Sequence, residues 1–216
     1  MERSSREWLV PLTGILFAVL LIVSFIVQGS PKSADKPARE VVQWYLDNKD
    51  SAEASAFIGT LAAVALVFFG GYLRKVLDGA GTMLSILPLI GLAIVAVGGA
   101  LDNMLLFAAA ERADDVPPVA IQAIQAIWDN DFLPLFLGVV VFNWSVGLAV
   151  LRTGALPKWM GWWGIVFGVV ALAGPIGFIG ALGAAVWVIL ASIVLSMRAR
   201  SPGAAPAARA AESPPS

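Results

Sequence analysis

The feature that most constrains this chain is a series of apolar segments, each about 20 residues long, separated by more polar stretches. A helix of about 20 residues is long enough to cross a hydrocarbon core of about 30 Å. We therefore predict an all-α fold, a polytopic membrane bundle of six transmembrane helices. The six predicted spans are residues 8–27, 55–73, 84–104, 132–151, 160–179 and 181–197.

The composition supports a membrane protein of one domain. Hydrophobic residues make up 59% of the 216 residues and charged residues 13%, against about half and about a quarter in soluble proteins. The apolar run of the first span is longer than that of a signal peptide and lacks an A-x-A site, so we expect it to remain uncleaved. We assign residues 1–197 to the membrane domain, and we expect the Ala/Pro/Ser-rich residues 198–216 to be a disordered cytoplasmic tail.

The last two spans are joined through "GPIGFIGALG", which contains Pro175 and four glycines. Proline and glycine interrupt helices, so this stretch has to form a tight turn if both spans are complete. A broken or re-entrant segment is the alternative, and the sequence leaves both readings open.

The positions of lysine and arginine predict the orientation of the bundle, because these residues concentrate on the cytoplasmic side. If the N-terminus is cytoplasmic, nine basic residues lie inside and five outside, so we predict that both termini are cytoplasmic and that the membrane is the plasma membrane. The inner set is Arg3, Arg6, Arg74, Lys75, Arg152, Lys158, Arg198, Arg200 and Arg209, and the outer set is Lys32, Lys36, Arg39, Lys49 and Arg112.

Two outer loops contain amphipathic segments, "PAREVVQWYLDNKD" and "PPVAIQAIQAIWDND". Their larger side chains recur at helical spacing: Val41, Trp44 and Tyr45 in the first, and Ile121, Ile124 and Trp128 in the second. We predict a helix in each loop, with Trp44 and Trp128 as anchors in the headgroup layer. Each helix either lies on the membrane and connects two spans, or forms a lid or partner-binding surface.

The two loops also resemble each other. "QWYLDNKD" begins at Gln43 and "QAIWDND" at Gln125, and both precede a span that ends in Leu-Arg, at Leu73-Arg74 and at Leu151-Arg152. This pattern suggests that spans 2 and 3 and spans 4 and 5 are parallel copies of one helical hairpin, although chance could produce the same few identities.

The most distinctive string, "LRTGALPKWMGWWGIVFGVVALAGPIG" at residues 151–177, resembles the L-P-(K/R)-W-x-G-W entry into the penultimate helix of certain multi-pass membrane proteins. These are uncharacterised actinobacterial integral membrane proteins of a family of unknown function. The resemblance is best over residues 130–195 and implies a six-span fold in a membrane. It implies no activity and no functional residues.

The same string holds interface anchors and packing glycines. Lys158 with Trp159, Trp162 and Trp163 is typical of an inner membrane interface, although a tryptophan cluster could also enclose a ligand. Gly164 and Gly168 form a G-x-x-x-G step that allows close helix packing, either within the chain or in a dimer.

The candidate ligand or ion residues are the polar groups inside predicted spans: Asp102, Asn103, Ser24, Gln28, Ser55 and Asn143. Asp102 lies about 27 Å from the inner end of its span, at a height similar to Ser24, Gln28 and Ser55, whereas Asn143 lies only about 12 Å from the inner end. Asp102 and Asn143 should therefore not pair. Gly98 and Gly99 share the face of Asp102, so we expect this face to contact other helices.

The residues that are absent restrict the chemistry. The chain has no cysteine and no histidine, which excludes disulfides, thiolate nucleophiles and bis-histidine haem ligation. No nucleophile–base pair, metal-ligand set or phosphate loop is visible, so we expect no cofactor, no metal and no nucleic-acid partner.

These observations leave several functional hypotheses. The first is a non-catalytic structural, regulatory or partner-binding component of the lipid bilayer, with a second copy or another membrane protein as partner. The alternative is a small transporter or channel in which Asp102 binds a cation or a proton, because intramembrane carboxylates are costly and often functional. A lipid-modifying enzyme is the third.

Overall fold

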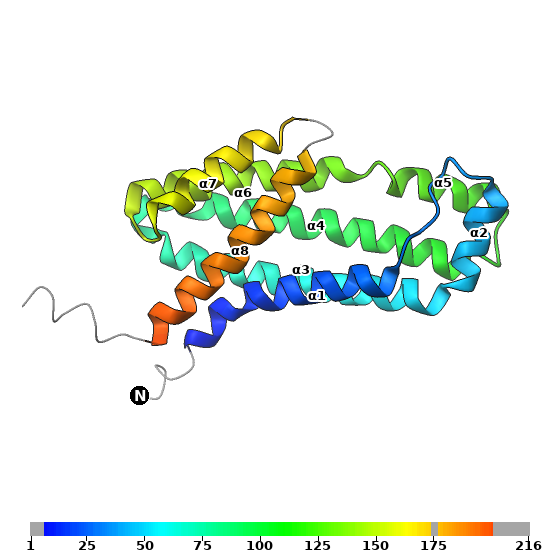
Figure 1. Ribbon diagram of the computed structural model, residues 1–216, viewed down its shortest axis with the longest axis horizontal. Coiled ribbons are helices and arrows are strands. Elements are labelled where there is room, and N and C mark those ends of the chain that lie inside the picture. The colour runs from blue at the N-terminus through cyan, green and yellow to red at the C-terminus, as the bar shows by residue number, and fades with distance from the viewer. Residues whose placement is uncertain (1–6, 174–176, 201–216) are drawn as a thin grey trace, which may run out of the picture.

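The computed structural model describes residues 7–173 and 177–200, and its regular elements are all helices (Figure 1). Residues 201–216, and with them most of the predicted tail, lie outside the described residues. The elements are η1 (Glu7–Leu12), α1 (Thr13–Gln28), α2 (Ala38–Asp47), α3 (Lys49–Val76), η2 (Asp78–Ala80), α4 (Thr82–Arg112), α5 (Pro118–Trp128), α6 (Phe132–Thr153), α7 (Lys158–Val170) and α8 (Gly177–Arg200).

Among the described residues, five helical stretches rather than six are long and apolar enough to span a membrane. They are Leu9–Gln28, Lys49–Val76, Thr82–Arg112, Pro118–Thr153 and Gly177–Ala199. The predicted span 160–179 is not one of them, because α7 has 13 residues and a length of about 20 Å, against a hydrocarbon core of about 30 Å. The residues that follow it include Gly174 and Pro175, which disfavour a continuing helix.

Glycines allow helices α4, α6 and α7 to approach one another closely. A Cβ atom added at Gly138 of α6 would lie 2.6 Å from the backbone nitrogen of Val95 in α4. A Cβ at Gly164 of α7 would lie 2.6 Å from the backbone oxygen of Asn143 in α6, and one at Gly168 would overlap the ring of Trp144. Gly164 and Gly168 therefore face α6 of the same chain.

Helix α8 crosses the bundle diagonally, from the start of α6 to the start of α1 (Figure 1). Near its first turn, the ring of Phe178 lies 5.0 Å from that of Phe136 of α6. Near its other end, a Cβ at Gly14 of α1 would overlap the side chain of Ser192. Helices α1 and α8 therefore meet at one end and diverge toward the other.

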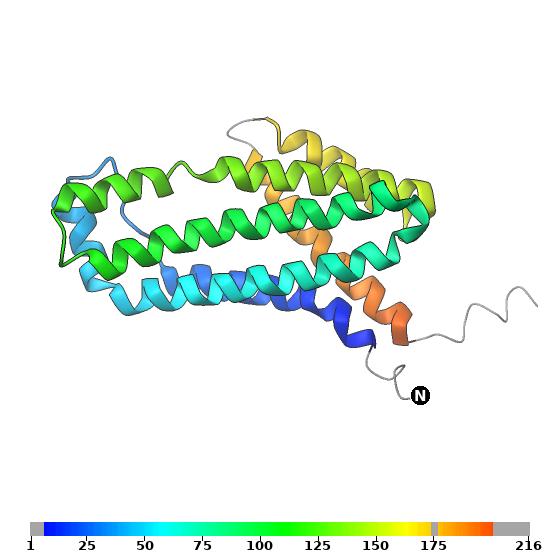
Figure 2. The same cartoon turned by 180° about the vertical axis from the view of Figure 1, so that it is seen from behind.

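The two loop helices, α2 and α5, lie at one end of the bundle, where the ends of α3 and α4 adjoin them (Figure 2). We use the term cap for α2, α5 and the adjoining ends of α3 and α4. Their apolar faces pack together around a separate buried cluster that includes Val41, Tyr45, Leu106 and Ile121. The helices predicted at both loops are thus present, and their apolar faces are buried against protein.

The other end of the bundle holds η1, η2, the α6–α7 turn and the end of α8 (Figure 1). Arg198 donates a hydrogen bond to the backbone oxygen of Ala155 and ties α8 to that turn. A second and larger core, with Phe69, Phe142 and Trp187 among its fully buried residues, fills the interior on this side of the molecule. We call this end the open end, in contrast to the cap end.

Candidate functional site

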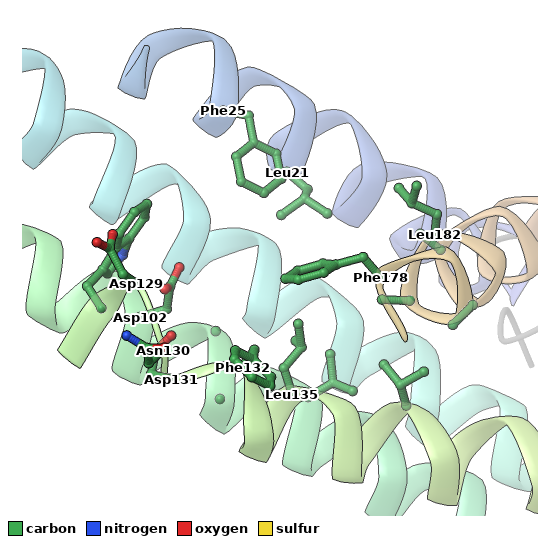
Figure 3. Close-up of a pocket in the computed structure, with 18 of the residues that line it drawn as sticks. Leu21, Phe25, Asp102, Asp129, Asn130, Asp131, Phe132, Leu135, Phe178 and Leu182 are labelled. Atoms are coloured by element: carbon green, nitrogen blue, oxygen red, sulfur yellow. The ribbon is translucent and has the colours of Figure 1, made fainter. Parts of the chain in front are cut away.

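A large cleft of about 910 Å³ occupies the space where α1 and α8 diverge (Figure 3). Helices α3 and α4 form its floor, α6 forms one wall, and residues 33–35 and 126–131 close it on the cap side. Its apolar lining includes Phe17, Leu21, Phe25, Leu66, Leu92, Val95, Phe132, Leu135, Phe178 and Leu182.

The large cleft has apolar walls and a polar end. Leu21, Phe178 and Leu182 lie along the walls, while Asp102 and Asp131 gather with Asp129 and Asn130 at the cap side (Figure 3). Asp35 is the fourth carboxylate of the lining, which includes no lysine or arginine among the described residues. The end is therefore acidic.

Asp102 comes from α4, and Asp131 comes from the break between α5 and α6, directly before α6. Helices α4 and α6 run antiparallel (Figure 2). A Cβ at Gly98 of α4 would lie 3.1 Å from the backbone nitrogen of Leu135 in α6, so the residue one turn later in α4 and the residue one turn before Leu135 also face each other. The two carboxyl groups line the same end of the large cleft, where one oxygen of Asp131 is buried without a hydrogen-bond partner among the described residues. Neither has a lysine or arginine partner in the part of the chain that the structure describes.

A small pocket of about 100 Å³ opens beside the large cleft and shares the Asp102 side chain with it. Its polar lining consists of Ser24 and Gln28 of α1 and of Asp102 and Asn103 of α4. Asn103 extends across to α3, where a Cβ at Gly59 would lie 2.6 Å from its amide nitrogen. Helices α1, α3 and α4 thus meet at the small pocket.

Ser24 and Ser55 fix the position of α1 on α3. The Ser24 hydroxyl donates to the backbone oxygen of Ser55 over 2.9 Å, and both side chains are buried. The structure therefore brings together five of the six predicted ligand residues, because Ser55 supports the small pocket that the other four line. Asn143 is separate: it is fully buried in α6, and neither atom of its amide group has a hydrogen-bond partner.

Asp129 fastens the loop before α2 to the end of α5, above the large cleft. One of its oxygens accepts hydrogen bonds from the backbone nitrogen of Ala34 at 2.9 Å and from Ser33 at 3.2 Å. The other accepts one from Gln125 at 2.8 Å, and Gln125 in turn accepts one from the Tyr45 hydroxyl at 2.6 Å. Burial raises the pKa of Tyr45 above its usual value, and the negative charge of Asp129 adds to this effect.

The remaining predicted residues lie at different places. Gly98 packs on α6, whereas a Cβ at Gly99 would meet no atom within 4 Å, because this glycine lines both pockets. Trp128 forms part of the large cleft. The other four predicted anchor tryptophans lie in the cap or on α7. Trp44 packs against the cap cluster, Trp163 donates a hydrogen bond to the backbone oxygen of Gly183, and Trp159 and Trp162 are exposed.

Asp131 is not among the ligand residues that the sequence predicts. The signal that could have identified it is the string Asp129-Asn130-Asp131, directly before a span and at the depth of Asp102. No group of three carboxylates within the described residues is arranged to hold a metal ion.

Comparisons of the chain with protein-family models, with curated proteins and with solved structures find no match. The resemblance drawn from residues 151–177 therefore stays a prediction.

Proposed function

We propose that the protein is a non-catalytic membrane component that binds a small amphiphilic molecule in the large cleft. The observation that carries this proposal is an apolar cleft of about 910 Å³ with a polar end, inside a bundle of membrane-spanning length. Ligand pockets typically enclose about 300–1,000 Å³, with mostly apolar walls and a few polar groups that orient the ligand.

The rim of the large cleft supports entry from the bilayer. Phe25, Phe178 and Leu182 line the cleft, and their exposed fractions are 60%, 55% and 67%. Large apolar side chains at a water-filled mouth would be unfavourable, whereas acyl chains can contact them without cost. A molecule dissolved in the bilayer therefore reaches the cleft sideways, between α1 and α8.

The proposed orientation places the protein in the plasma membrane, with the cap outside and both termini in the cytoplasm. Arg74, Lys75, Arg152, Lys158 and Arg198 support it, since their elements meet at the open end. Asp102 lies 20 residues beyond the start of α4 at Thr82, which is about 30 Å along the helix and close to the outer boundary of the hydrocarbon.

A transporter with Asp102 as its cation or proton site is the second candidate. The pair of Asp102 and Asp131 in the large cleft favours it. The closed interior around Phe69, Phe142 and Trp187 argues for simple binding, since it leaves access from one side of the molecule. Transport would require α8 to move away from this core.

The proposal can be tested by filling the cleft at Gly99. Leucine at this position meets no neighbour within 4 Å of its Cβ, and it should favour the helix by up to about 1 kcal/mol relative to glycine. Gly99→Leu should therefore fold well while it occupies the cleft. Gly71→Leu is the matched control, because Gly71 is also helical, has open space around it and lies outside both pockets.

The measurement is the melting temperature in lipid nanodiscs with dodecylamine, dodecan-1-ol or dodecanoic acid, three probes that share one chain and differ in charge. At least one probe should raise the melting temperature of the wild type and of Gly71→Leu by several degrees, because a ligand that binds only the folded state stabilises it. Gly99→Leu should lose this response. No response in the wild type, or an equal response in Gly99→Leu, would contradict the proposal.

A further inference from the structure

The small pocket contains a buried amide that lacks a partner. Gln28 is only 8% exposed, lines this pocket, and forms no hydrogen bond within the described part of the chain. An amide that is shielded to this degree and has no partner loses most of the hydrogen bonds that water would offer it. An amide retained at such a position is explained if a ligand provides the missing bond.

The groups around Gln28 can all accept hydrogen bonds. The Ser24 hydroxyl has already given its hydrogen to the backbone of Ser55, which leaves its lone pairs available. Asn103 and Gln28 each carry a carbonyl oxygen, and Asp102 contributes a carboxylate. The small pocket therefore suits a group that donates several hydrogen bonds at once.

The charge around the small pocket is negative. Asp102 borders both pockets, Asp131 lies at the same end of the large cleft, and no lysine or arginine is present in either described lining. Carboxylates that share one end of a low-dielectric site repel each other unless a cation or a proton neutralises one of them. A cationic group beside Asp102 would remove this repulsion.

We infer that the ligand is an amphiphile with a primary ammonium head group, which binds in the small pocket against Asp102, Gln28 and Asn103 while its apolar body fills the large cleft. This inference rests on the proposed function and specifies its ligand. An ammonium group donates three hydrogen bonds and carries the required charge. A quaternary ammonium donates none and has to fit into about 100 Å³. A phospholipid would bring its phosphate next to four carboxylates of the lining.

The experiment compares dodecylamine, dodecyltrimethylammonium and dodecan-1-ol at pH 7, where a primary amine is protonated as lysine is. Apparent Kd values come from melting temperature against free probe concentration in nanodiscs, with Gly99→Leu as the baseline for effects of each probe on the bilayer. Wild type should bind dodecylamine at least tenfold more tightly than either of the other two probes.

Variants then assign the preference to the small pocket. Asp102→Asn should weaken dodecylamine at least tenfold and leave dodecan-1-ol within twofold. Gln28→Leu, which keeps every carboxylate, should also reduce the preference for dodecylamine. Asp114→Asn should change nothing, since Asp114 is an exposed acid of the cap that lines neither pocket.

The outcomes separate this inference from the proposed function. If the three probes bind with equal affinity and Gly99→Leu abolishes all binding, the cleft binds amphiphiles and the ammonium preference is wrong. If Asp102→Asn and Gln28→Leu both keep the wild-type preference, the small pocket is not the head-group site. If none of the probes binds, the proposed function fails, and the inference fails with it.

Discussion

Tyr45 joins the two cap helices by a side-chain hydrogen bond. It lies on α2, is 1% exposed, and donates to the fully buried Gln125 of α5. Because burial raises the pKa of Tyr45, the folded protein favours the neutral, donating phenol more strongly than the unfolded chain does.

Replacing Tyr45 with phenylalanine should destabilise the protein in a pH-dependent way. At pH 8 we expect Tyr45→Phe to lower the free energy of unfolding by about 1–3 kcal/mol, because the carbonyl of Gln125 loses its donor. A folded pKa above the unfolded value of about 10 means that this contribution is complete below pH 10 and declines above it. Denaturant titrations from pH 8 to 12 should therefore show the difference between the two proteins becoming smaller, and a constant difference would contradict this assignment.

Residue positions along the spans could be predicted from the sequence because the rise per residue of a helix is fixed. That relation predicted the common height of Ser24, Gln28, Ser55 and Asp102, and the structure places them around one point. It could not predict the pairing with Asp131, which depends on where the chain breaks between α5 and α6. Hydrophobic periodicity carries no information about the path of such a break.

The two cap helices have the same local structure, which extends the similarity seen in the sequence. Each follows a proline with nearly the same backbone conformation, with φ −51° and ψ 137° at Pro37, and φ −57° and ψ 141° at Pro117. Gln43 donates to Asp47 as Gln125 donates to Asp129, over 2.7 and 2.8 Å. The asparagine that follows each aspartate bonds back to the carbonyl four residues earlier. Superposition of the complete hairpins stays a prediction of the duplication.

The two aspartates of this repeated motif should differ in importance. Asp47 accepts a hydrogen bond from Gln43, whereas Asp129 also accepts two from the loop at Ser33 and Ala34. Each such bond contributes about 0.5–1.5 kcal/mol net. We expect Asp129→Ala to lower the free energy of unfolding by about 1–2 kcal/mol more than Asp47→Ala, measured by denaturant titration. Equal losses would show that the loop bonds contribute nothing.

Helix boundaries were predictable where apolar residues alone decide them, and less so at α7. The predicted apolar span covers residues 160–179, but α7 ends at Val170. Composition does not show how far a helix continues, because both a complete span and a shorter helix satisfy the same hydropathy. A broken segment at this place is one of the two alternatives that the sequence allows.

The topology of the whole molecule can be tested with single cysteines, because the native chain contains none. Cysteine introduced at position 155, in the turn that accepts the hydrogen bond from Arg198, should react with an impermeant maleimide only after the membrane is opened. Cysteine at position 114, in the cap, should react in intact cells. Labelling of position 155 but not of 114 in intact cells would reverse the proposed orientation.

Helices α1 and α8 cross near Gly14 and Ser192, so a small change in their crossing angle would displace the far end of α8 by a larger distance. Ser192 lies against Gly14 with no space for a larger residue, so this contact can act as a fulcrum. Gly177, at the start of α8, is 15 residues away, or about 22 Å along the helix. A rotation of about 10° at the fulcrum would displace that end by about 4 Å. The distance between Phe178 and Phe25 therefore depends on the angle at this contact as well as on the packing of α8 against α6 and α7.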